Sequence, residues 1–117
     1  MSNRNRTAGH NWERQGVKDL KHIFPDIVTS RSESKRTDDK GIDFCYTEPF
    51  QFQFKTYSKT VNYHKIMNKM KDNGATNPVI MIKQTRKAKS RFVTIGKYMV
   101  IDYELGLKLI ENYVSNK

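Results

Sequence analysis

Cysteine, acidic residues and long apolar runs are all scarce in this sequence. Cys45 is the only cysteine, which excludes an intramolecular disulfide and a cysteine-rich zinc site. No apolar run approaches the roughly 18 residues that a membrane-spanning helix needs. The polar N-terminus lacks the apolar segment of a secretory signal. We therefore expect a protein of a reducing cytoplasm that has no membrane partner.

The hydrophobic content is also low. The chain has 117 residues, of which 36% are hydrophobic, enough for one compact domain with a single small core. We find no internal repeat, low-complexity segment or interdomain linker. Residues 1–8 are expected to be a flexible basic arm, and residues 9–117 a single domain.

Acidic residues are unevenly placed as well as few. The chain has 22 Lys and Arg against 12 Asp and Glu, a net charge of +10. Between Pro49 and Ile101 there are eleven basic residues and one acid, Asp72. A charged coat that served only solubility would not separate the two signs in this way, although ribosomal and histone-like proteins show a similar bias. The charge predicts a polyanionic partner, with nucleic acid ahead of a membrane surface, but does not by itself predict an enzyme.

Hydrophobic periodicity predicts the element order α-β-β-β-α-β-β-α. A helix is expected over residues 9–24, where Glu13, Val17, Leu20 and Phe24 recur at helical spacing. The other expected elements are strands at 26–31, 42–46, 50–55, 77–84 and 92–101, a basic loop or hairpin tip at 85–91, and helices at 62–74 and 102–114. Such a mixture indicates an α/β domain, with a central mixed sheet flanked by helices.

Two of the strands are expected to form a hairpin, because apolar side chains alternate with others in I-D-F-C-Y and F-Q-F-Q-F-K. If Phe44 faces Phe52, every apolar residue meets an apolar one, and the same register sets Asp43 opposite Gln53. Lys55 lies on that same face. Burial of the aromatic face thus predicts a carboxylate, an amide and an ammonium group together on the other.

Glu13 stands out because it lies on the apolar stripe of the first helix. A buried unpaired carboxylate costs several kcal/mol and needs a cation, a metal or a proton. Alternatively, Glu13 lies in the first turn, reaches solvent past Trp12 and interacts favourably with the helix dipole. Together with Asp43 and Gln53, it would offer the hard oxygen ligands that suit Mg²⁺. Lys55 would orient a water or stabilise charge on the scissile phosphate.

The run D-x(9)-Q-x-K at residues 43–55, after a helix with the pair E-R, resembles the PD-(D/E)XK nuclease superfamily. Within it, the segments GHNWER, TSRSES, GID and QFK are similar to the archaeal-type Holliday junction resolvases and their phage-encoded relatives. The resemblance covers about residues 9 to 100. It implies a restriction-endonuclease-like fold.

The resemblance also implies roles for individual residues. In those enzymes a helix glutamate, an aspartate and a hairpin acid bind metal while a lysine assists catalysis, and these roles fall on Glu13, Asp43, Gln53 and Lys55. The catalytic loop Arg and Ser of the family correspond to Arg31 and Ser34, although Ser32 could align instead of Ser34. Gln53 replaces the usual acid, as in the Q-x-K variant of Mrr-type restriction enzymes. An amide oxygen ligates Mg²⁺ without adding charge, so we expect weaker metal binding.

Basic residues form a second group of candidates, because phosphate contacts need charge and reach but no sequence code. The expected DNA-binding residues are Arg4, Arg6, Arg14, Arg31, Lys35, Arg36, Lys65, Lys69, Lys83, Arg86, Lys87, Lys89 and Arg91. Lys65 and Lys69 could equally be the solvated side of their helix.

These patterns and the resemblance lead us to expect an endodeoxyribonuclease that depends on Mg²⁺ or Mn²⁺ and cuts branched DNA. Four-way junctions are the favoured substrate, in recombination or repair, in the host cytoplasm if the protein is phage-encoded. Cuts on opposing strands need two active sites and hence a homodimer. The apolar side of the last helix would lie in the dimer interface or cap the sheet; it comprises Leu105, Leu109, Ile110 and Tyr113.

Two alternatives remain open. One is a nuclease of the same fold that acts on linear or single-stranded DNA in repair, packaging or restriction. The other is a DNA-binding module without catalytic activity.

Overall fold

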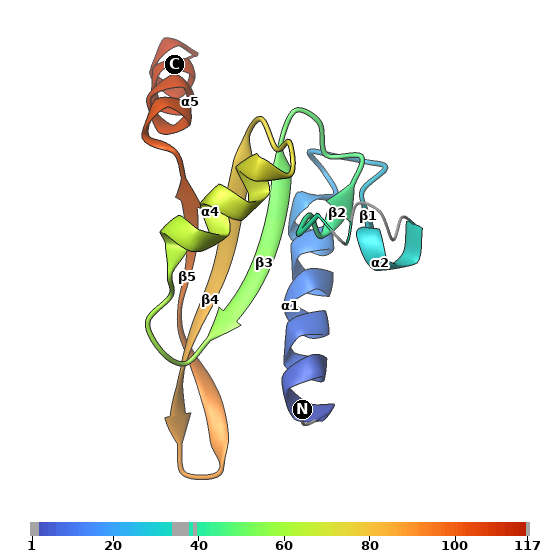
Figure 1. The fold of residues 1–117 in the computed structure, drawn as a ribbon, viewed down its shortest axis with the longest axis vertical. Helices are drawn as coiled ribbons and strands as arrows, with labels where there is room; N and C mark the ends of the chain where they lie inside the picture. Colours follow the sequence, from blue (N-terminus) through green and yellow to red (C-terminus); the bar gives the residue numbers. More distant parts are fainter. Residues whose placement is uncertain (1–2, 34–37, 39, 117) are drawn as a thin grey trace.

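Helices and strands are mixed along the chain (Figure 1). The computed structural model describes residues 3–33, 38 and 40–116, with side chains from Ala8 onward. Its elements are α1 (Asn3–Leu20), β1 (Val28–Thr29), α2 (Ser30–Glu33), β2 (Phe44–Cys45), β3 (Gln51–Tyr57), α4 (Tyr63–Asp72), β4 (Pro78–Ala88), β5 (Arg91–Ile101) and α5 (Tyr103–Ser115). The expected α/β class is confirmed, and the short helix α2 is an addition to the expected order. No helix in the described part of the chain is long and apolar enough to cross a membrane.

The strands form two sheets, whereas a single central sheet was expected. β1 and β2 pair antiparallel in a two-stranded sheet. The other sheet has the order β3-β4-β5, with β3 parallel and β5 antiparallel to β4. This second sheet is mixed, as expected. β3 therefore lies at one of its edges.

Helix α4 makes the crossover between the parallel strands β3 and β4, which a short turn cannot join. The side chain of Asn62 accepts a hydrogen bond from the Lys65 backbone amide at 3.1 Å and so caps the helix N-terminus. The buried side chains Met67 and Met70 pack in one cluster with Ile80 of β4. This apolar face fixes α4 on one side of the sheet.

Helix α1 packs on the other side, where alternate residues of β4 point. Trp12 is buried there, and its indole nitrogen donates to the carbonyl of Met81 at 3.0 Å. Gly16 lies directly against the ring of Phe54, so a Cβ atom at this position would overlap that ring. The missing side chain thus lets α1 approach β3 closely, and Figure 1 shows the two side by side.

The bounds of α1 differ from the expected helix at both ends. The helix begins at Asn3, within the segment expected to be an irregular arm; no proline interrupts this segment. It ends at Leu20, whose carbonyl accepts hydrogen bonds from both Ile23 and Phe24. This tight turn forms because Pro25 disfavours helical geometry in the residue before it.

The hairpin expected between residues 42–46 and 50–55 does not form a ladder. β2 pairs with β1, with Cys45 opposite Val28, while β3 pairs with β4. The positive φ of 65° at Tyr46 ends the extended conformation directly after Cys45. The expected register therefore applies only in part.

Two features of that hairpin survive as local contacts. The backbone amide of Asp43 donates to the carbonyl of Phe52 at 2.8 Å. The rings of Phe44 and Phe54 meet edge to face, with 4.7 Å between their centroids. The aromatic side chains are thus buried together, which keeps Asp43 beside β3.

The β4–β5 hairpin is longer than expected. β4 continues to Ala88 and β5 begins at Arg91, so most of the basic segment 85–91 is strand and not loop. The segment forms the tip of the hairpin, which was the other expected alternative. A register shift between Gln84 and Thr85 lets the ladder continue past an irregularity. The turn itself is short, with Lys89 at a positive φ of 55°.

Helix α5 projects from the far end of the sheet (Figure 1). Leu105 packs against the core, but Leu109, Ile110 and Tyr113 are exposed. The described side chains of α5 include no buried one. The expected alternative in which this helix caps the sheet is therefore wrong for all but its first turn.

Candidate active site

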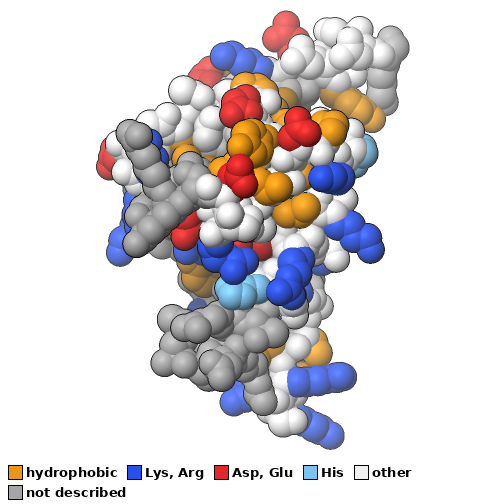
Figure 2. Space-filling model, turned by 90° about the vertical axis from the view of Figure 1, so that its right-hand side faces the viewer, with side chains coloured by type: hydrophobic (Ala, Val, Ile, Leu, Met, Phe, Trp, Pro, Cys, Tyr) orange, Lys and Arg blue, Asp and Glu red, His pale blue; other side chains and the backbone are white. Residues whose placement is uncertain are grey.

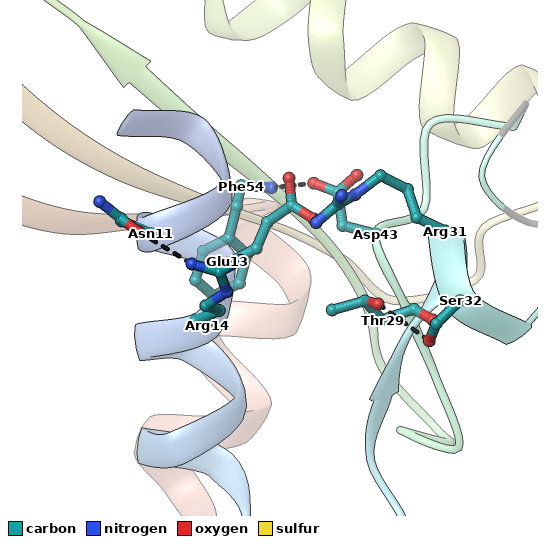
Figure 3. Close-up of polar contacts among 8 residues, drawn as sticks. All are labelled: Asn11, Glu13, Arg14, Thr29, Arg31, Ser32, Asp43 and Phe54. Atoms are coloured by element: carbon teal, nitrogen blue, oxygen red, sulfur yellow. Dashed lines mark hydrogen bonds and ion pairs between the residues drawn. The ribbon is translucent and has the colours of Figure 1, made fainter. Parts of the chain in front are cut away.

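The free edge of β3 is covered by Asp43, which precedes β2. The backbone amide of Phe54 points out of this edge and donates to the carboxylate Oδ2 of Asp43 at 2.6 Å (Figure 3). The carbonyl of Asp43 accepts from the amide of Ser30 at 2.7 Å. The first bond satisfies an amide that the edge of β3 would otherwise leave unpaired. The second holds the backbone of Asp43 in place, so the carboxylate is fixed in one position.

The carboxyl group of Asp43 has an unusual acidity. Its pKa is raised from 3.8 to about 7, mainly by burial and against the opposing effect of the Phe54 amide. The negative charge of Glu13 contributes to this rise, and that of Asp38 does so to a smaller extent. The positive charge of Lys55 lowers it. A cation beside this group would stabilise its ionised form.

Glu13 extends from α1 toward Asp43, and Figure 3 shows the two carboxylates pointing toward one another. The side chain of Glu13 is only 15% exposed. Its Oε1 atom accepts from the guanidinium of Arg31 in α2, with the nearer nitrogen at 3.3 Å. Of the two interpretations of Glu13, the structure has the inward one. The cation that the carboxylate needs is supplied by Arg31.

Gln53 and Lys55 lie on one face of β3, two residues apart. The amide of Gln53 is buried and satisfies both of its neighbours in one orientation: its nitrogen donates to the carbonyl of Gly41 at 3.3 Å, and its oxygen accepts from Lys55 Nζ at 3.2 Å. Gly41 has a φ of +77°, which favours glycine. Gln53 therefore positions the ammonium group whose charge acts on Asp43.

Several expected site residues either lie outside the described part of the chain or are not part of this cluster. Ser34, Lys35 and Arg36 lie outside the described residues, as do the side chains of Arg4 and Arg6. Ser32, the alternative to Ser34, donates its hydroxyl to the carbonyl of Thr29 at 2.9 Å. Figure 3 shows this pair apart from the two carboxylates.

The oxygen atoms of the cluster suit a hard divalent cation. The described residues contain no group of three or more His, Cys, Asp or Glu side chains arranged to hold a metal. The site offers two carboxylates and an amide oxygen instead. Mg²⁺ commonly uses one or two carboxylates and completes its shell with waters and substrate phosphates. Glu13, Asp43 and Gln53 therefore fit Mg²⁺ better than a softer transition metal.

Basic side chains extend away from the cluster. Arg14 is exposed and donates to Asn11 at 3.2 Å. The other described basic candidates are exposed, apart from the half-buried Lys83: Lys65 and Lys69 on α4, and Arg86, Lys87, Lys89 and Arg91 along the β4–β5 hairpin. Figure 2 shows Lys and Arg, and no Asp or Glu among the described side chains, over the lower part of the face that carries α1.

The basic candidates predicted from the sequence did not include Lys97. Its ammonium group lies 5.7 Å from the centre of the Trp12 ring, and that of Lys83 lies 5.9 Å from it. The two lysines are cross-strand partners. The alternation of β5 could have placed Lys97 on the α1 face, had the register of the hairpin been known.

No family model matches this chain, and no curated protein or solved structure is significantly similar to it.

Proposed function

We propose that this protein is a metal-dependent endodeoxyribonuclease with a restriction-endonuclease-like site, and that it cuts branched DNA. One observation carries the proposal. Glu13 of α1, Asp43 before β2, and Gln53 and Lys55 of β3 meet at one strand edge. A structural role alone does not require two carboxylates to face each other, at the cost of raising the pKa of one of them to about 7.

Each residue of the cluster has a distinct role in this proposal. Glu13, Asp43 and Gln53 would hold Mg²⁺, which supplies a water of lowered pKa and offsets charge on the phosphate. Lys55, oriented by Gln53, donates to the attacked phosphate or to the water. Arg31 neutralises Glu13 in the free protein and is available to a DNA phosphate.

The choice of DNA follows from charge, and the choice of branched DNA from the resemblance to junction resolvases. The net charge of +10 favours binding to phosphates. A four-way junction presents two strands for symmetric cuts, which a two-fold homodimer can make. Recombination and repair are the processes in which such a substrate arises.

The proposal is tested with a synthetic four-way junction, beside a matched duplex and a matched single strand, with Mg²⁺ or with a chelator. We expect paired nicks on opposing strands near the branch point, only with the metal. Equal cleavage of the duplex or of the single strand would favour a nuclease that acts on linear or single-stranded DNA. Binding without cleavage would rule out nuclease activity.

A DNA-binding module without catalysis is a second candidate. It is favoured by the ion pair of Glu13 with Arg31 and by an amide in place of the usual acid at Gln53. Asp43→Asn separates the two, because asparagine can still accept from the Phe54 amide. For a nuclease, cleavage should fall by at least about 100-fold, as when a transition-state interaction is lost, with junction affinity unchanged. The matched control Asp72→Asn alters an exposed acid on α4 and should cleave normally.

A further inference from the structure

A cavity of about 700 Å³ is lined by none of the four residues of the candidate active site but shares two elements with it. It is bounded by Ala8 of α1, by the end of β3 and by the β4–β5 hairpin. Its volume falls within the range typical of small-ligand sites. A nucleotide-sized group could therefore enter it.

The described lining of the cavity contains three cations, Lys59, Lys83 and Arg91, and no acid. Two aromatic side chains, Tyr57 and Phe92, stand among them. Phe92 is 45% exposed, although a side chain of this kind is usually buried. Cations beside exposed aromatic rings are the means by which proteins bind unpaired nucleotides, because the cations attract phosphate and the rings stack on bases.

The cavity is connected to the candidate active site by two elements. On β3, Lys55 belongs to the site and its neighbour Thr56 lines the cavity, so their side chains point to opposite faces of the strand. On α1, Glu13 belongs to the site and Ala8 lines the cavity, about 7.5 Å apart along the helix axis. The cavity thus lies on the face of β3 that carries Phe54 and α1, whereas Lys55 lies on the other face.

We propose that this cavity binds an unpaired nucleotide of the DNA substrate. Lys59, Lys83 and Arg91 contact its phosphates, and its base stacks on Phe92. The proposal rests on the proposed function, whose substrate it specifies: DNA that carries unpaired bases, as an open junction does at its centre. Perfect duplex cannot fill the cavity.

The test is binding in the presence of a chelator, so that no cleavage occurs. The probes are a DNA duplex and the same duplex with a short single-stranded gap that carries the fluorescent base 2-aminopurine. We expect the gapped DNA to bind about 5- to 140-fold more tightly, as the gain of one base–aromatic stack implies. We also expect the probe fluorescence to be quenched on binding.

Phe92→Ala should abolish both the preference and the quenching, and Phe92→Tyr should retain them. Arg91→Ala should lower affinity for the gapped DNA more than for duplex. The matched controls are Tyr98→Ala, an exposed aromatic residue of β5, and Lys89→Ala, a basic residue at the hairpin turn; both lie outside the cavity lining and should keep the preference. Equal affinity of the wild type for both probes would overturn the proposal. It would also be overturned if the control variants lost the preference for gapped DNA to the same extent as Phe92→Ala.

The outcome is separable from that of the proposed function. Junction cleavage without any preference for gapped DNA would refute the proposed role of the cavity and leave the proposed nuclease activity intact. A preference that depends on Phe92, in a protein that never cleaves DNA, would support the role of the cavity and refute the nuclease activity.

Discussion

Asp43 combines two properties that oppose one another. Its carboxylate accepts the Phe54 amide at the edge of β3, which favours the ionised form. Its burial and the charge of Glu13 disfavour that form more strongly, so its pKa is about 7. In the metal-free protein this residue is therefore protonated below neutral pH.

The raised pKa predicts a pH-dependent stability for the metal-free protein. In the unfolded chain Asp43 ionises near 3.8, whereas in the folded protein it does so near 7. Between these values the folded state holds a proton that the unfolded state has lost. The contribution of Asp43 to stability should thus be full below pH 4 and decline by up to about 1.4 kcal/mol per pH unit toward pH 7.

The measurement is urea unfolding in a chelator across this pH range, for the wild type and Asp43→Asn. The difference between their unfolding free energies isolates this residue from other titrating groups. Parallel curves for the two proteins would contradict the prediction. Glu13→Gln removes a charge that raises the pKa and should shift the decline to lower pH.

At the scale of elements, the distance between α1 and β3 determines whether Glu13 can reach Asp43. Gly16 permits this distance because a side chain there would overlap the ring of Phe54. The backbone amide of Phe54 is also the donor that holds Asp43. Packing of one helix on one strand is thereby coupled to the geometry of the site.

Gly16→Ala is accordingly expected to destabilise the protein, by about 1–3 kcal/mol as for other overpacked sites, and to reduce cleavage. The matched control is Gly9→Ala on the same helix, where no atom lies within 4 Å of the added Cβ. That change should be neutral, or stabilising by up to about 1 kcal/mol, because alanine favours helix. Unfolding free energies from urea titration give the comparison, and equal values for the two variants would be inconsistent with close packing at Gly16.

For the whole molecule, the notable feature is apolar surface at the α5 end. Ile110 is 63% exposed, and neighbouring apolar side chains on α5 are exposed with it. Contiguous exposed apolar surface commonly marks an interface. The homodimer of the proposed function would bury this surface.

Ile110→Glu should therefore weaken dimerisation by more than about tenfold, since each 1.4 kcal/mol of lost contact has that effect. Asn112→Glu adds the same charge at another exposed position of α5 and should leave the dimer intact. Sedimentation equilibrium gives the association constants. A wild type that is monomeric at micromolar concentration would refute the prediction. A dimer unaffected by Ile110→Glu would show that the interface lies elsewhere on the molecule.

Local patterns in the sequence were sufficient for the α/β class and for most element positions. They also brought Asp43, Gln53 and Lys55 into one neighbourhood, because burial of the phenylalanines leaves the alternate residues on the opposite side. The predicted hairpin ladder was nonetheless wrong. The bend at Tyr46 and the pairing of β2 with β1 carry no periodic signal.

By itself, the sequence determined most of the segments that are helix or strand, how charge is divided along the chain and which polar residues accompany the aromatic ones. These are properties of neighbouring residues, and periods of two or 3.6 residues express them directly. Only the tertiary structure decided which strands pair, that Glu13 faces Asp43, and that basic and aromatic side chains line one cavity. Such arrangements follow from packing the whole core, in which segments far apart in sequence are selected together.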